Sequence, residues 1–132
     1  MNNLTNSKGI VRAFVLFGVD IGGEQYIFCH KNDGIELPGV ELLDGNDPET
    51  FIKKGIHSKY NLELKKIQLY SKPPFSVWDE GVGKSVSYEF YKALEYSGEL
   101  PKEKEFYAPA GEIHDFINKM SMEFKPQRLK RI

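Results

Sequence analysis

One segment in the middle of the chain carries the signals of a helix start and a helix end. Asp47 suits the cap position, where its carboxylate can accept hydrogen bonds from free backbone amides, and Pro48 fits the first helical position. Glu49 complements the positive end of the helix dipole. The sequence therefore predicts a helix from Asp47 or Pro48 to about Tyr60, with Asn61 as a left-handed terminator.

The rest of the chain is predicted to form strands and one further helix. The buried stripe of the central helix is predicted to be Phe51, Ile52 and Ile56, and a second amphipathic helix is expected at residues 112–120. Residues 71–85, which contain Trp78, are expected to form a long loop. Strands are expected at residues 9–18, 25–30, 36–37, 62–70 and 85–94.

Composition limits the class of protein. A length of 132 residues predicts one domain over residues 1–132 with a single core. The 18 basic and 19 acidic residues give a net charge of −1, so neither nucleic acid nor a membrane is indicated as a partner. The lone Cys29 cannot form an internal disulfide, and residues 1–8 lack the apolar stretch of a signal peptide. We therefore expect a soluble, cytoplasmic protein.

Residues 39–62, GVELLDGNDPETFIKKGIHSKYNL, follow the outline of a known motif. The segment resembles the Nudix box of the MutT-like proteins, G-x5-E-x7-R-E-U-x-E-E-x-G-U, in which U is aliphatic. Gly39 matches the first glycine, and Ile56 and Leu62 match the two aliphatic positions. Residues 37–39 also resemble the L-P-G-G segment of the family, with Val40 in place of the second glycine.

Matches outside the box extend this resemblance over nearly the whole chain. Residues 91–93, YKA, are similar to the F-x-A that closes a later strand of the family. Residues 106–107 and 112–113 resemble the aromatic and E-L pairs that open its last helix. The resemblance implies an α+β fold, a Nudix-like α/β/α sandwich with a mixed β-sheet.

The resemblance also implies a metal site, and this chain lacks the residues for it. In the family, glutamates on one face of the box helix hold one to three Mg²⁺ or Mn²⁺ ions, which polarise a diphosphate and activate water. Here Arg-Glu is Lys54-Gly55, Glu-Glu is Ser58-Lys59, and the first acidic position is Asn46. Every metal-binding carboxylate of the box is thus replaced. We expect a degenerate Nudix box with no metal cofactor and no catalytic residue.

The replaced positions favour binding over catalysis. Lys59 places a cation where the family holds its metal, so with Lys54 it could neutralise a phosphate without activating water. The expected ligand site combines Gly39 with the helix face that carries Lys54, Ser58 and Lys59. Trp78 could stack on a nucleobase or cover the core. The plain alternative is that Lys59 is an ordinary surface lysine.

Three functions remain open at this point. The first is a catalytically inactive Nudix-fold protein that binds a nucleotide or another phosphate-containing small molecule. The second is a Nudix-type pyrophosphohydrolase of a nucleoside diphosphate derivative, with Mg²⁺ or Mn²⁺ held by relocated carboxylates such as Asp44, Asp47 or Glu89. The third is a protein-interaction module, and a homodimer is also left open. The missing carboxylates argue against the second function, and the retained Gly39 loop favours the first over the third.

Overall fold

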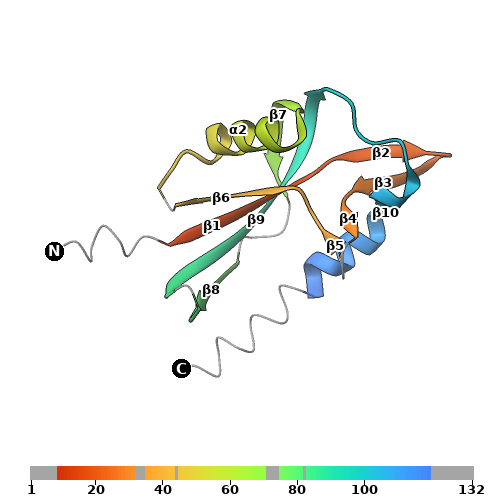
Figure 1. Ribbon diagram of the computed structural model, residues 1–132. Helices are drawn as coiled ribbons and strands as arrows, with labels where there is room; N and C mark the ends of the chain where they lie inside the picture. Colours follow the sequence, from red (N-terminus) through yellow and green to blue (C-terminus); the bar gives the residue numbers. More distant parts are fainter. Residues whose placement is uncertain (1–8, 32–34, 44, 71–74, 82, 120–132) are drawn as a thin grey trace.

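The computed structural model describes residues 9–31, 35–43, 45–70, 75–81 and 83–119. It shows a mixed β-sheet with one helix on each face (Figure 1). The helix α2, Pro48–Tyr60, packs on one face, and the helix formed by residues 110–119 packs on the other. The α/β/α sandwich expected from the sequence is therefore confirmed.

The central sheet has five strands in the order β6-β1-β9-β7, with β8 also paired to β9. β1 pairs with β9 in parallel and with β6 in the antiparallel sense, and both β7 and β8 run antiparallel to β9. This combination makes the sheet mixed, and it leaves β6 at an edge. The strands span Ile10–Leu16 (β1), Gly39–Leu43 (β6), Glu63–Leu69 (β7), Phe75–Asp79 (β8) and Lys84–Ser97 (β9).

A smaller sheet extends from one end of the central one (Figure 1). Its order is β10-β3-β2, formed by Tyr107–Pro109, Glu24–Phe28 and Gly18–Ile21. Two short strands, His30–Lys31 (β4) and Ile35–Glu36 (β5), pair with each other beside it. The 3₁₀ helix η1, Lys104–Phe106, leads into β10. These pieces form a wall near the C-terminal end of α2.

The limits of α2 agree with the prediction. Pro48 is at the start of the helix, and Asn61 ends it in the left-handed conformation, with φ of 56°. Asp47 is the cap residue, but its side chain accepts no hydrogen bond from a backbone amide. It accepts a hydrogen bond from the Thr50 hydroxyl group instead. The expected role of the Asp47 carboxylate as a cap was therefore wrong, although its position was right.

The buried stripe of α2 is narrower than predicted. Ile52 and Ile56 are fully buried against the sheet, whereas Phe51 is 44% exposed and is not part of the core. The reason is helical geometry, because adjacent residues point about 100° apart and Ile52 already faces the sheet. No helix in the described ranges is long and apolar enough to cross a membrane.

Several strands were missed from the sequence. The interval 71–85 was expected to be a loop, but β8, Phe75–Asp79, forms within it and pairs with β9. Phe, Val and Trp favour strands, and Gly83, at φ of 75°, allows the turn that follows. The expected ranges also miss β6, whose backbone bonds to β1, and β10 and most of β2, which pair with β3. Each of these strands depends on a partner that local sequence does not reveal.

The exposure of Phe51 leads to a test of stability. We expect Ile56→Ala to lower the free energy of unfolding by about 2–5 kcal/mol, because Ile56 is fully buried. Phe51→Ala should cost less than about 1 kcal/mol, since substitutions at exposed positions usually have small effects. Urea denaturation of both variants measures the difference. Equal losses would contradict the placement of Phe51 outside the core.

Candidate functional site

The C-terminal half of α2 lies beside the edge strand β6, and a hollow of about 560 Å³ opens between them. We call it the α2–β6 hollow. It contains three of the residues expected from the sequence, Lys54, Ser58 and Lys59. The residues that line it are Val40, Glu41, Phe51, Lys54, Gly55, Ser58 and Lys59.

Lys59 makes the contact that joins the two sides of this hollow. Its ammonium group donates a hydrogen bond to the carbonyl oxygen of Gly39, at 3.0 Å from Nζ to O. Gly39 is the first residue of β6, so this bond brings together two of the residues that the sequence places at the expected ligand site. Backbone carbonyl oxygens are also ligands for hard metal cations. Here the Gly39 carbonyl oxygen accepts a hydrogen bond from the Lys59 ammonium group instead.

Gly55 allows α2 to approach β6 very closely. A Cβ atom added at Gly55 would lie 2.2 Å from Cγ1 of Val40 and 3.2 Å from its Cβ. Val40 stands at the second glycine of the resembled L-P-G-G segment, and Gly55 stands at a glutamate of the box. The two replacements are therefore complementary, because a valine methyl group fills the space that a side chain at position 55 would need.

These contacts do not fit a divalent metal ion at the box helix. Position 55 has no side chain and no room for one, and the Lys59 ammonium would repel a second cation. Ser58 offers only a neutral hydroxyl group. Within the described residues, no three His, Cys, Asp or Glu side chains lie together as a potential metal site.

The carboxylates that could replace the missing ligands already have partners. Glu41, which lines the hollow, accepts a hydrogen bond from Arg12 at 3.0 Å, and this bond is the main cause of the raised pKa of Arg12. Glu89 accepts one from the Tyr91 hydroxyl at 2.6 Å. Burial first, and then this bond, raises the pKa of Tyr91.

Two further carboxylates, at the start of α2, also have partners. Glu49 forms an ion pair with Lys53 at 2.8 Å, one turn along the helix. The Asp47 carboxylate accepts a hydrogen bond from the Thr50 hydroxyl group. Asp44, which was also considered as a relocated ligand, lies outside the described residues. The positions of Asp47 and Glu49 thus follow the helix start rather than a metal.

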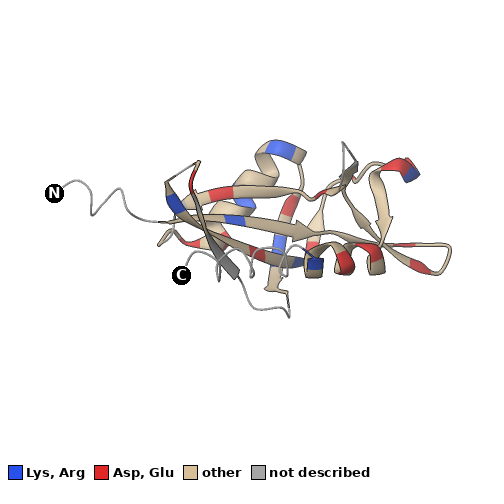
Figure 2. Ribbon diagram, turned by 90° about the horizontal axis from the view of Figure 1, so that it is seen from below, with Lys and Arg blue, Asp and Glu red and all other residues tan. Residues whose placement is uncertain are grey.

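Positive charge at the hollow is local. Lys54 and Lys59 are exposed, and neither has a carboxylate partner in the part of the chain that the structure describes. Figure 2 shows basic and acidic residues interspersed over the described elements. An anion would therefore meet these two lysines at a specific place on α2.

Trp78 does not join the other expected residues. It lies on β8, opposite Ser85 of β9, and is 50% exposed. It is not among the described residues that line the α2–β6 hollow. The exposed aromatic ring at the hollow is instead that of Phe51. Sequence reasoning missed this role, since helical spacing assigned Phe51 to the core.

Comparison with solved structures identifies the fold. The ORF135 protein of E. coli is 11% identical, with a TM-score of 0.53 over 79% of this chain and 73% of that chain. The Ap4A hydrolase of C. elegans is 12% identical, with a TM-score of 0.50 over 86% of this chain and 97% of its own. The MutT protein of Bacillus halodurans is 17% identical, with a TM-score of 0.49 over 80% and 71%.

At these identities the likeness concerns the fold alone. No family model matches the chain, and no curated protein matches it. The solved structures that resemble it include MutT and Nudix hydrolases, and the chain has a Nudix-like fold. The resemblance inferred from residues 39–62 is confirmed at this level.

The contact between Gly55 and Val40 predicts an unusual effect of a helical Gly→Ala change. Such a change normally stabilises a helix by up to about 1 kcal/mol, but Gly55→Ala should destabilise the protein by about 1–3 kcal/mol through overpacking. Val40→Ala should remove most of this penalty in the double variant. Gly111→Ala is the matched control, because a Cβ atom there meets nothing within 4 Å. Chemical denaturation of the four variants measures the coupling, and additive effects would contradict it.

Proposed function

We propose that this Nudix-fold protein binds a phosphate-containing small molecule, such as a nucleotide, in the α2–β6 hollow and does not hydrolyse it. The observation that carries the proposal is the Lys59 ammonium group, held 3.0 Å from the Gly39 carbonyl oxygen. It provides a fixed positive charge between the box helix and β6. That charge can neutralise a phosphate, but it cannot polarise and deprotonate a water molecule as a metal ion does.

The surrounding side chains support the recognition of an anion. Lys54 adds a second exposed ammonium group, and Ser58, one turn after Lys54, offers a hydroxyl donor on the same side of α2. Hydrogen bonds from charged donors to phosphate oxygens are stronger than neutral ones. The exposed ring of Phe51 lies in the same hollow and can cover an apolar part of the ligand.

The competing functions have weaker support. A pyrophosphohydrolase with relocated ligands would need free carboxylates, but Glu41 and Glu89 are engaged by Arg12 and Tyr91. A protein-interaction module would not require two lysines without carboxylate partners around a hollow. Binding of a phosphate-containing molecule without hydrolysis therefore explains more of the described contacts than the two competing functions.

Lys59 gives the sharpest test of binding. A thermal-shift screen of ADP-ribose, nucleoside triphosphates and dinucleoside polyphosphates should show stabilisation that does not depend on Mg²⁺. For any compound that binds, Lys59→Glu should weaken affinity by about tenfold or more, equivalent to about 1.4 kcal/mol. Lys66→Glu, the same charge change at an exposed position on β7, should leave the affinity within about twofold. Absence of stabilisation would overturn the proposal, and unchanged affinity in Lys59→Glu would make Lys59 a surface residue only.

A second test concerns metal and hydrolysis. Calorimetric titration with Mg²⁺ or Mn²⁺ should show no saturable binding at millimolar concentration, and phosphate release from the same compounds should remain at background. Robust Mg²⁺-dependent turnover that is lost on changing Asp47 or Glu89 would establish the relocated-ligand reading instead.

Restoring the box carboxylates extends this test. Gly55→Glu with Lys59→Glu should not bind metal well, because the new side chain at position 55 collides with Val40. Adding Val40→Gly opens that space, so the triple variant should show saturable Mn²⁺ binding before any activity is recovered. Equal metal binding by the double and triple variants would show that Val40 does not block the site.

A further inference from the structure

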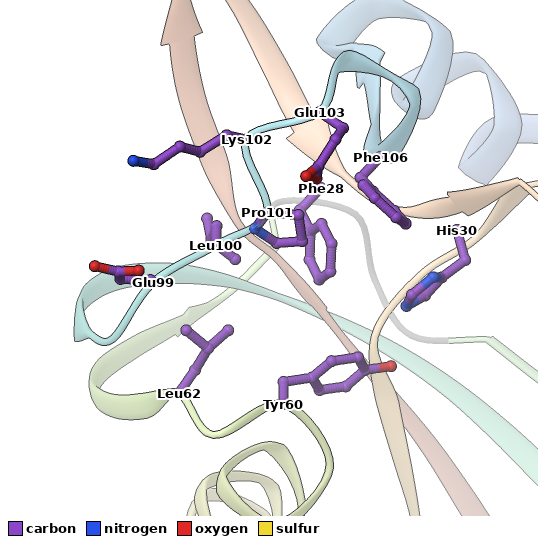
Figure 3. A pocket seen from close by; sticks show the side chains of 10 residues that line it. All are labelled: Phe28, His30, Tyr60, Leu62, Glu99, Leu100, Pro101, Lys102, Glu103 and Phe106. Carbon is purple, nitrogen blue, oxygen red and sulfur yellow. The ribbon is translucent and has the colours of Figure 1, made fainter.

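A second cavity lies at the C-terminal end of α2, where the helix meets the smaller sheet (Figure 3). Its volume is about 570 Å³, within the range of small-molecule sites. We call it the aromatic pocket. Its walls come from β3, β4, the end of α2 and residues 99–106. None of the residues that line it belongs to the α2–β6 hollow.

The pocket is built around a cluster of rings. The His30 ring lies 6.0 Å from the Tyr60 ring with an angle of 25° between their planes, and 6.1 Å from the Phe106 ring with an angle of 84°. The buried ring of Phe28 packs edge-on against both His30 and Tyr60, at 5.5 Å and 5.9 Å. His30, Tyr60 and Phe106 are only half-buried, so these rings remain accessible to a ligand. Such walls fit a flat aromatic ring.

The polar group that faces the pocket is a carboxylate. Figure 3 shows the side chain of Glu103 pointing toward the rings, whereas those of Glu99 and Lys102 point away from them. The rest of the lining includes the rings of His30 and Tyr60, which also carry polar atoms, and apolar side chains such as Leu62 and Leu100. An ionised carboxylate accepts hydrogen bonds but donates none, and it repels phosphate. A planar ligand that presents N–H donors therefore fits both the rings and the Glu103 carboxylate.

Hydrogen bonds hold the wall of the pocket in place. The backbone amide of Cys29 donates to the carbonyl oxygen of Phe106 at 2.9 Å, which fixes η1 beside His30. The Tyr107 hydroxyl donates to the Pro101 carbonyl oxygen, and the Phe106 amide donates to that of Glu103 at 3.1 Å. The segment that carries Glu103 is thus anchored without a ligand, which lowers the entropic cost of binding.

We infer that the aromatic pocket binds a heteroaromatic ring with two adjacent N–H donors, as on the edge of a guanine-type base. The ring would stack on His30 and Tyr60, and its donors would meet the two oxygens of Glu103. Adenine presents one amino group beside an acceptor nitrogen, and the carboxylate disfavours that arrangement. The inference does not depend on the proposed phosphate site, because a nucleoside without phosphate can test it.

Isothermal titration calorimetry with guanosine tests the inference on the unaltered protein. Guanosine should bind, and inosine, which lacks the amino group, should bind at least tenfold more weakly, as should adenosine. Equal binding of the three nucleosides would show stacking without recognition by Glu103. That result, or no binding of guanosine, would overturn the inference. Phosphate-independent binding of guanosine would stand even if Lys59 proved to have no role.

Variants of the aromatic pocket test which residues contact guanosine. Glu103→Gln replaces one acceptor oxygen with a donor and should weaken guanosine binding at least tenfold, while Glu105→Gln, an equal charge change on η1 outside the pocket, should leave it within twofold. His30→Leu should weaken binding about fivefold or more, and His30→Phe, which keeps a ring, should restore most of it. Thermal unfolding without ligand checks that each variant is folded. Equal effects of Glu103→Gln and Glu105→Gln would contradict a direct contact.

Discussion

The close approach of α2 to the edge strand β6 is the contact on which the rest of the site depends. The approach is possible because Gly55 has no side chain, so a methyl group of Val40 fills the space in front of it. With the helix this close, the Lys59 side chain reaches back to the Gly39 carbonyl oxygen. One packing contact therefore removes a ligand position and also places a cation beside β6.

This arrangement changes the chemistry of the fold without changing the fold. A divalent ion stabilises charge on a diphosphate and also activates water, whereas an ammonium group provides only the first effect. Four carboxylates, those of Glu41, Asp47, Glu49 and Glu89, are held by Arg12, Thr50, Lys53 and Tyr91, so they serve local structure. Fold similarity to hydrolases thus coexists with side chains that, in the function we propose, bind a ligand without hydrolysing it, since function resides in the site and not in the fold.

The C-terminal end of α2 organises two different environments. On one side, Lys54 and Lys59 present positive charge in the α2–β6 hollow. On the other side, Tyr60 contributes a ring to the aromatic pocket, where Glu103 supplies negative charge. These opposite charges imply different ligand chemistry, an anionic group at the lysines and a donor-rich ring at the carboxylate.

The sequence by itself determined the limits of α2 and, through the resemblance of residues 39–62, the fold class and the absence of carboxylates from the matched positions of the box. These features rest on local signals: Pro48 and Asn61 mark the helix ends, and residue identity alone decides whether a carboxylate is present. Tertiary structure decided the exposure of Phe51, the strands β6 and β8, and the cluster of His30 with Glu103. Those features depend on which segment lies alongside which. The spacing of residues along a chain cannot specify this, because strand partners and pocket walls come from segments far apart in the sequence.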